Sequence, residues 1–338
     1  MSLLLQLRSI VQAATQSAPL SGRQPASDTR EFGCQLPGRA PGAPQPSGQL
    51  IVCERFLQTD APVVNWRDDP RFNAYNRCCY RGANGPRSDP RPYHPAEGMA
   101  ERTARYRPRK ELQGQRQDLA VLQKLIRQIV LHHDGADSSA DCFHILHDER
   151  GLSAHFLIDT DGTIYQTLDL ADIAFHAQFV NNCSIGIELC NRGSIKLQCS
   201  AHHKKNREPR LIRIHGYTYE MWSYTEAQYE SLARLLTALS RLLPEVAVRY
   251  PRNSSQELVQ TQLESPRSWA GLLGHYHVSQ SKWDPGCLDW EKLVGRVRTA
   301  TLIAPHFAAE SVGAGTASSD GIAPPRSTPA AELPPTGG

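Results

Sequence analysis

Residues 184–190 read Ser-Ile-Gly-Ile-Glu-Leu-Cys, a short run that is nearly all apolar apart from Glu188. A short apolar run without polar alternation is typical of a strand buried on both faces. We therefore expect a central strand here. A carboxylate in such a strand is costly to bury without a partner. Glu188 is thus either part of a structural ion pair or a site carboxylate with a raised pKa.

The segments around this run alternate between strand and helix patterns. Apolar residues alternate along the expected strands, and Asp161-Gly162 separates two runs of β-forming residues. We expect a strand at 127–133, a helix at 139–151 closed by Gly151, a hairpin at 154–168, a helix at 225–243, a strand at 246–249 and a helix at 289–298. Strands that alternate with helices predict an α/β fold, with a mixed central β-sheet flanked by helices.

The helix at 225–243 has the strongest pattern. Thr225 can cap its N-terminus, and Gln228 completes a capping box. An apolar stripe runs along it, formed by Leu232, Leu235, Leu236, Leu239, Leu242 and Leu243. Such a stripe predicts that the helix covers one face of the sheet.

The chain has 338 residues, of which 40% are hydrophobic, so it can form one large domain or two modest ones. Residues 1–49 are rich in Pro, Gly and Ser and predict a linker or disorder. Residues 50–111 gain aromatic residues without clear periodicity, which indicates an N-terminal arm or small module. We expect one organised domain at 112–304 and a disordered, low-complexity tail at 305–338. The polar stretch from 250 to 268 is expected to form a loop.

The net charge of +3 is too balanced to favour nucleic acid, so we expect no nucleic-acid partner. The nine cysteines are odd in number and imply no disulfide scaffold. We interpret most of them as small buried apolar residues, although Cys53 could pair with Cys78 or Cys79 in an oxidising compartment. Arg8 interrupts the apolar N-terminus, and no run approaches the ~18 apolar residues of a membrane span. We expect neither a clean signal peptide nor a transmembrane segment.

Two segments carry the chemistry of a zinc site. IVLHHDG contains His132, and GHYHVSQSKWDPG contains His275 and Asp284. Two imidazoles and one carboxylate fill three corners of a tetrahedron and leave the fourth for water. Glu188 and Lys282 add a carboxylate and a cation, which amide hydrolysis needs beside such a metal.

The neighbouring histidines leave alternatives open. His132 alone is also explained as a hydrogen-bonded histidine at a strand end. His133 would point to the opposite face of an extended strand. His277 could replace His275 as a ligand, because the two would share a face if their segment were a strand.

Five segments occur in an order that resembles a known family: IVLHHDG, LSAHFLIDTDGTIYQ, FHAQ, SIGIEL and GHYHVSQSKWDPG. Residues from about 125 to 298 resemble the zinc-dependent N-acetylmuramoyl-L-alanine amidases. That family includes phage-lysozyme-type amidases, anhydro-muropeptide recycling amidases and animal peptidoglycan recognition proteins. Each segment alone is a weak signal, but five in order are specific.

The resemblance implies roles for individual residues. Its metal positions are His132, His275 and Asp284, which would bind Zn²⁺. Its acid/base position is Glu188, and Lys282 matches the lysine two residues before the third ligand. On the substrate side, His176 matches a histidine that lines the groove, and Ala154 stands where phage-type members carry a catalytic tyrosine.

The chain also departs from the family pattern. FHAQ replaces W-H-A-G, so the groove wall near Phe175 is expected to differ. The interval from His275 to Asp284 is one residue shorter than usual, which affects the placement of Lys282. Cys287 follows the D-P-G where proline is common.

The resemblance implies a monomeric zinc amidase, with residues 112–304 as its catalytic domain. It would cleave the amide bond between the lactyl group of N-acetylmuramic acid and L-alanine in bacterial peptidoglycan or muropeptide fragments. The alternatives are a non-catalytic peptidoglycan-binding module of the same fold and a zinc amidase acting on a different amide. Without a convincing export signal we expect a cytoplasmic location by default, with export to the cell wall as the alternative.

Overall fold

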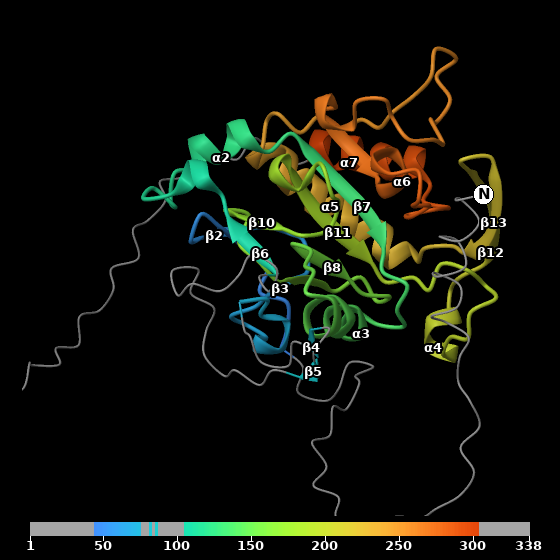
Figure 1. Cartoon of the computed structure of the whole chain (residues 1–338), viewed down its shortest axis with the longest axis horizontal. Coiled ribbons are helices and arrows are strands. Elements are labelled where there is room, and N and C mark those ends of the chain that lie inside the picture. Colours follow the sequence, from blue (N-terminus) through green and yellow to red (C-terminus); the bar gives the residue numbers. More distant parts are fainter. Residues whose placement is uncertain (1–43, 76–80, 83–84, 87–104, 304–338) are drawn as a thin grey trace, which may run out of the picture. The chain divides into compact units, whose positions relative to one another are not determined.

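The computed structural model describes residues 44–75, 81–82, 85–86 and 105–303 (Figure 1). The predicted linker up to residue 43 and the predicted tail at 305–338 lie outside these residues. Cys78 and Cys79, the suggested partners of Cys53, also lie outside them, as does part of the predicted arm at 50–111.

A six-stranded mixed sheet forms the centre of the domain. Its strands lie in the order β14 (Gly271–Gly274), β7 (Gln128–His133), β11 (Ser184–Leu189), β8 (Phe156–Ile158), β9 (Ile164–Gln166) and β3 (Val63–Asn65). β14, β7, β11 and β8 run parallel, β9 is antiparallel to β8, and β3 is parallel to β9. This confirms the predicted α/β fold with a mixed central sheet, and β11 is a central strand as predicted.

Smaller elements surround this sheet. Four strand pairs lie outside it: β1 (Gln49–Val52) with β2 (Arg55–Gln58), β4 (Arg81–Gly82) with β5 (Gly85–Pro86), β6 (Tyr106–Pro108) with β10 (Asp172–Ala174), and β12 (Pro209–Ile214) with β13 (Tyr217–Trp222). The α-helices are α2 (Leu119–Leu125), α3 (Ser139–Phe143), α4 (Ala201–Lys204), α5 (Glu226–Leu242), α6 (His275–Val278) and α7 (Trp290–Ile303). Shorter helical turns are η1 (Pro70–Phe72), η4 (Lys110–Leu112), the π-helical η5 (His144–Arg150), η6 (Asn181–Cys183) and η7 (Pro266–Ser268).

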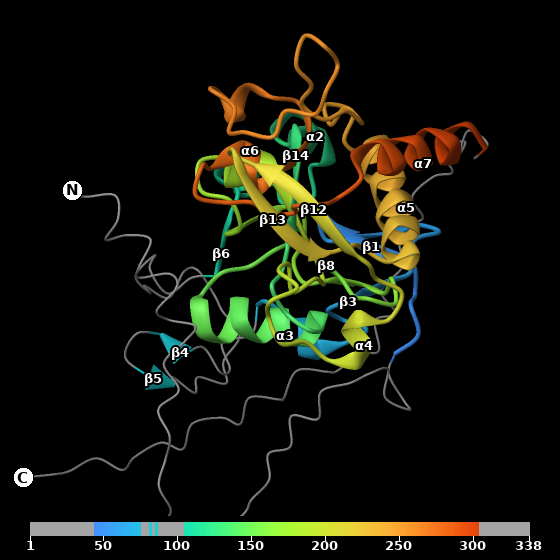
Figure 2. The same cartoon turned by 90° about the vertical axis from the view of Figure 1, so that its right-hand side faces the viewer.

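The two faces of the sheet have different neighbours. The odd-numbered apolar residues of β7 and β11 join the main hydrophobic core together with the leucine stripe of α5 and the apolar face of α7. α5 and α7 pack against each other on this side of the strands (Figure 2). Because side chains alternate along a strand, His132 and Glu188 face the other way. The sheet therefore separates the core formed with α5 and α7 from the side chains of His132 and Glu188.

Several predicted element ends are confirmed. The Thr225 side chain accepts a hydrogen bond from the Gln228 N–H, and the Gln228 side chain accepts one from the Thr225 N–H, which completes the capping box. Gly151 ends the helix pair α3–η5 in the left-handed conformation, at φ 64°. β8 and β9 form the predicted hairpin, and the Asp161-Gly162 turn joins them.

The predicted strand at 246–249 is wrong. Local bonds from the Val246 N–H to the Leu243 carbonyl and from the Arg249 N–H to the Ala247 carbonyl bend this segment into turns. One backbone hydrogen bond joins this segment to β14, from the Leu272 N–H to the Arg249 carbonyl. The edge of the sheet beside β7 is taken by β14 instead. The stretch that follows, 250–268, is a loop as predicted, with η7 at its end.

The described part of the predicted arm contributes to the main core. β3 is the edge strand beside β9, and Leu50, Val52 and Val63 belong to the same hydrophobic core as α5. The domain boundaries themselves stay a prediction. Among the described helices, none is both long and apolar enough to cross a membrane.

Candidate metal centre

The predicted site residues gather where three parallel strands end. His275 directly follows β14, His132 is the penultimate residue of β7, and Glu188 is the penultimate residue of β11. Glu188 pairs in register with His132, so their side chains share a face. Ligand sites of open α/β sheets form at this carboxyl edge.

The three predicted metal ligands meet in space. His132 Nδ1 lies 3.1 Å from His275 Nδ1 and 2.9 Å from Asp284 Oδ2, and the latter two atoms are 3.0 Å apart. All three residues are buried. The structure therefore brings together side chains that are 9 to 152 positions apart in sequence.

These atoms fit a zinc ion. Ligands about 2.0–2.1 Å from a tetrahedral zinc lie about 3.3–3.4 Å from one another, close to the spacing found here. The lone pairs of two neutral imidazole nitrogens and of one carboxylate oxygen also meet in one place. A single cation bound there would accept all three. Among the described residues, this is the only group of His, Cys, Asp and Glu side chains that could hold a metal ion in this way.

The loop that carries Asp284 is held close to the end of β14. The Tyr276 N–H donates to the Asp284 carbonyl at 3.1 Å, and the Tyr224 hydroxyl donates to the Pro285 carbonyl at 2.7 Å. A Cβ atom at Gly274 would come within 2.8 Å of Pro285 Cδ. Glycine at this position thus permits the close approach that brings Asp284 beside His275.

Burial and charge set the protonation of the ligands. Burial and, to a lesser extent, the charge of His275 together lower the pKa of His132 to about 4. Burial alone would raise the pKa of Asp284, but the charge of His275 and hydrogen bonds from His132 and His275 hold it well below its usual value. Neutral imidazole and ionised carboxylate are the forms that bind a metal.

Glu188 is a buried carboxylate without a structural ion pair. Its side chain is 6% exposed, and Oε2 has no hydrogen-bond partner among the residues that the structure describes. Burial raises its pKa well above the usual value, and the charges of Asp284 and Asp134 raise it further. Of the two explanations given above for Glu188, this environment favours a site carboxylate over an ion pair.

His176 lies against a ligand histidine. Its Nδ1 is 3.1 Å from His132 Nε2, and its Nε2 is 3.2 Å from the Ser184 hydroxyl. Gly186 makes room for the ring, because a Cβ there would come within 2.5 Å of His176 Cγ. The contact with His132 suits a residue that orients a ligand, because a metal-bound histidine usually donates its other N–H to a fixed partner. The one sequence signal for this contact is Gly186, a glycine between two isoleucines of β11.

The other two predicted residues lie differently. Lys282 is half-buried, and its positive charge lowers the pKa of both His132 and Glu188, which places it close to the centre. Ala154 is 2% exposed and belongs to a separate apolar cluster with Leu157.

The neighbouring histidines have structural roles. His133 occupies the opposite face of β7, as predicted, and its ring packs against Trp283 at 4.4 Å. Residues 275–278 form the helical turn α6, so the condition under which His275 and His277 would share a strand face is not met. His277 accepts a hydrogen bond from the Gly274 N–H at 2.9 Å and donates one to the Val259 carbonyl at 2.7 Å. Both ring nitrogens of His277 therefore bind backbone groups and are not available to a metal ion.

Solved structures of three amidases are similar to this chain. AmpD is 22% identical, with 60% of this chain and 97% of that chain covered and a TM-score of 0.33. AmiD from E. coli is 20% identical, with 51% and 57% covered and a TM-score of 0.33. AmpDh3 from Pseudomonas aeruginosa is 20% identical, with 51% and 59% covered and a TM-score of 0.35. The chain thus spans less than two thirds of the AmiD and AmpDh3 chains.

At these scores the structural similarity adds nothing to the assignment, and no curated protein matches the sequence. The assignment rests on the family model of the N-acetylmuramoyl-L-alanine amidases, which matches residues 122–287. This range contains every one of the predicted metal, catalytic and substrate-side residues. Over residues 122–287 the chain is thus similar to the N-acetylmuramoyl-L-alanine amidase family.

Proposed function

We propose that this protein hydrolyses the amide bond between the lactyl group of N-acetylmuramic acid and L-alanine, in peptidoglycan or in muropeptides released from it. The observation that carries the proposal is the triangle of His132, His275 and Asp284 ligand atoms, 2.9–3.1 Å apart, with Glu188 beside it in register. The three ligands would hold a zinc ion. Bound there, zinc supplies a Lewis acid that activates water and polarises the scissile carbonyl.

Glu188 would carry the proton. Its raised pKa brings it nearer to neutrality than an exposed glutamate, which suits a group that must both accept and release a proton. In the proposed reaction it accepts a proton from the attacking water. It then delivers that proton to the alanine nitrogen as the carbon–nitrogen bond breaks.

Lys282 and His176 would support this step in different ways. The Lys282 ammonium would stabilise the negative charge that develops on the carbonyl oxygen, and one such donor is typically worth about 2.7–4 kcal/mol. His176 would hold the ring of His132 in place through its 3.1 Å contact with Nε2. Its predicted contact with the substrate stays a prediction.

The direct test is to incubate the purified protein with intact sacculi and, separately, with anhydro-muropeptides, and to analyse the products by mass. Hydrolysis at the proposed bond releases a peptide with a free N-terminal L-alanine and leaves the lactyl carboxylate on the sugar. Glu188→Gln is the matched control, because it keeps the shape of the side chain and loses the proton acceptor.

Other outcomes identify the alternatives. Binding of muropeptide without cleavage would indicate a recognition module, and cleavage of another amide would indicate a different substrate. The AmiD complex holds anhydro-N-acetylmuramic acid-L-Ala-D-γ-Glu-L-Lys, which makes this muropeptide a suitable probe for the present chain. Faster cleavage of fragments than of sacculi would support the proposed cytoplasmic role in recycling, and the reverse preference would support export to the wall.

A further inference from the structure

The β12–β13 hairpin contacts the loop that carries Lys282 and Asp284, which we call the Asp284 loop (residues 279–287). Near one end of this loop, the ring of His215, in the turn between β12 and β13, donates from Nε2 to the Lys282 carbonyl at 2.9 Å. At the other end, the Cys287 N–H donates to a sulfur atom of β13, that of Met221, at 3.1 Å. The hairpin is therefore attached to the loop on both sides of Asp284.

An aromatic stack joins the hairpin to the middle of the same loop. The rings of Tyr219 and Trp283 are nearly parallel, with 4.6 Å between their centroids and 4° between their planes. The ring of His133, the last residue of β7, packs against Trp283 at 4.4 Å. Trp283 thus contacts both the hairpin and the central sheet. Because it lies between Lys282 and Asp284 in the sequence, its stack restrains the backbone of both residues.

Two glycines allow this close packing. Gly286 and Gly193 have positive φ values, 61° and 75°, which glycine adopts without strain. A Cβ atom at Gly286 would collide with Met221 Sδ, and one at Gly193 would come within 2.8 Å of the Trp283 ring. The Trp222 N–H also donates to the Gly193 carbonyl at 3.0 Å, which ties β13 to the chain that follows β11. The hairpin therefore fits closely against the loop and its neighbours.

The first half of the Asp284 loop has few other restraints. Gln280 and Ser281 are exposed, and the Lys282 N–H makes a local bond to the Ser279 carbonyl at 3.1 Å. Among the described residues, the bond from His215 is the only hydrogen bond that reaches residues 280–283 from outside 275–286. The position of the Lys282 backbone therefore depends on the hairpin.

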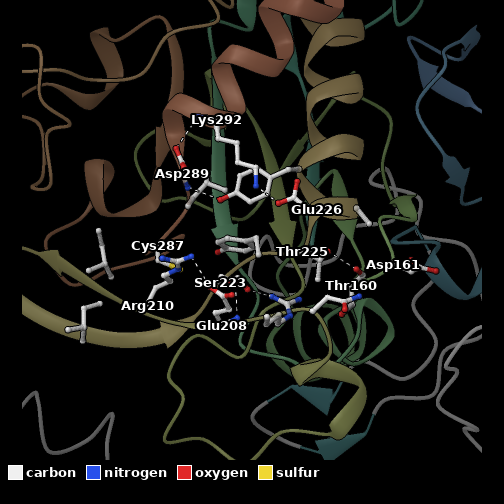
Figure 3. A pocket seen from close by; sticks show the side chains of 18 residues that line it. Thr160, Asp161, Glu208, Arg210, Ser223, Thr225, Glu226, Cys287, Asp289 and Lys292 are labelled. Carbon is white, nitrogen blue, oxygen red and sulfur yellow. Dashed lines mark hydrogen bonds and ion pairs between the residues drawn. The ribbon is translucent and has the colours of Figure 1, made fainter.

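The strand β12 borders a different cavity. Arg210 of this strand, Ser223 and Cys287 line it beside the N-terminal ends of α5 and α7 (Figure 3). None of the predicted metal, catalytic or substrate-side residues lines this cavity. Substitutions in the turn and in β13, rather than at the cavity wall, should therefore affect the metal centre.

We propose that the β12–β13 hairpin is a positioning element of the metal centre, in which His215 holds the backbone of Lys282 and Tyr219 holds Trp283. The inference rests on the proposed function, in which Lys282 stabilises the developing negative charge. A displacement of about 1 Å can cost about 10²-fold in rate, so loss of either contact should lower turnover. The zinc should remain, because Asp284 keeps its backbone bond to α6.

The first test changes His215, whose backbone is left-handed at φ 51°. Asparagine tolerates this conformation, but in His215→Asn the side chain is too short to reach the Lys282 carbonyl. In His215→Gln an amide N–H takes the approximate place of Nε2. On a soluble muropeptide we expect kcat to fall about tenfold in His215→Asn, with KM and zinc content nearly unchanged, and to fall by less than about threefold in His215→Gln.

A double-mutant cycle shows whether His215 acts through Lys282. In protein that already carries Lys282→Ala, His215→Asn should not lower kcat further, because the group that it positions is absent. If the two losses multiply, His215 acts elsewhere and the proposal is overturned. His144→Asn, at an exposed histidine of η5, is the matched control and should leave kcat unchanged.

The second test removes the stack. Tyr219→Phe keeps the ring and should keep kcat, whereas Tyr219→Ala should lower it by about fivefold or more, again without loss of zinc. Tyr217→Ala is the matched control, because this ring lies two residues earlier in β13 and is 69% exposed. A loss of kcat in Tyr217→Ala as large as that in Tyr219→Ala would mean that general damage to the hairpin is responsible, and would overturn the role of the stack.

A readout that needs no activity separates this proposal from the proposed function. Backbone hydrogen exchange is followed by mass spectrometry in the full-length protein. We expect faster exchange in peptides that cover 279–286 in His215→Asn than in the unchanged protein, and equal exchange in peptides of β7. This change in a protein that hydrolyses no muropeptide would contradict the proposed function and support the hold of the hairpin on the loop. Unchanged exchange, or unchanged kcat in an active protein, would overturn the positioning role.

Discussion

The metal centre and the surroundings of Arg207 lie near the same end of β11, but they balance buried charge in different ways. In the centre, the ionised Asp284 contacts His132 at 2.9 Å and His275 at 3.0 Å, so the carboxylate faces two imidazole nitrogens. Arg207 instead donates hydrogen bonds to carbonyl and amide oxygens and forms no ion pair with a described residue.

The difference shows how each region accommodates a buried charge. In the centre, one cation would complete a closed set of ligand atoms whose residues come from recognisable motifs. Arg207 is held by oxygen atoms of unrelated segments. Loss of a residue from the centre should therefore affect chemistry, whereas loss of Arg207 should affect stability.

The largest effect is expected from the metal ligands. His132→Ala, His275→Ala and Asp284→Ala should each abolish hydrolysis and weaken zinc binding, because three ligands leave no spare. Metal content and rate are measured together for each variant. His133→Ala is the matched control and should keep the zinc, because its ring packs on Trp283 instead. If His133→Ala lost the metal and His132→Ala retained it, the assigned register of β7 would be contradicted.

The next largest effect separates chemistry from metal binding within the centre. Glu188→Gln should keep the fold and the zinc but lower turnover by about 10²–10⁴-fold, the usual contribution of a general acid/base. The measurement is a single-turnover rate on a soluble muropeptide, with metal analysis of the same sample. A rate close to that of the unchanged protein would make Glu188 structural.

A smaller effect is expected at Lys282. Lys282→Ala should lower turnover by about 10²-fold and change substrate binding much less, because the charge it meets develops mainly in the transition state. Steady-state kinetics on a soluble muropeptide give kcat and KM separately. A change confined to KM would show that Lys282 holds the substrate in its ground state.

The structural histidines should make stability depend on pH. Burial lowers the pKa of His277 to about 3 and that of His155 to about 3, from an ordinary value of 6.5. The unfolded chain therefore binds more protons between these values, so stability is full above about pH 6.5 and falls as the pH drops toward 3. Melting temperature measured across this range should fall with acid, and less steeply in His277→Gln. Equal slopes in the two proteins would exclude a contribution from His277.

The smallest effect is expected on the surface of α5. Ala227→Phe should change the amidase rate by less than about twofold, because the position is exposed in the first turn of this helix and is not one of the predicted site residues. The rate is measured on the same soluble muropeptide. A large loss of rate in this variant would remove the distinction between the two regions.

Much of the fold was predictable from local patterns. The strands β7 and β11, the hairpin β8–β9 and the capping box of α5 follow from apolar periodicity and turn residues, which act over a few positions. The strand predicted at 246–249 is wrong because an apolar pattern does not show which segment pairs with the edge of β7. Gly271–Gly274 takes that edge, although two of its four residues are glycines.

The site was predictable only in part, for a similar reason. The order of the sequence motifs predicted the metal ligands, and the structure brings those residues together. The contact of His176 with His132 and the role of His277 depend on how distant segments pack, which local patterns do not encode. The burial of Arg207 carried no sequence signal, because it depends on contacts with the distant residues Cys190, Ser223 and Gln228.

The central claim is that His132, His275 and Asp284 hold a zinc ion on which hydrolysis depends. The most direct measurement is the metal content of the purified protein, followed by its rate on an anhydro-muropeptide before chelation, after chelation and after zinc is restored. We predict about one zinc per chain, loss of hydrolysis when the zinc is removed and recovery when it returns. Hydrolysis that continues at full rate in protein shown to be free of zinc would contradict the account.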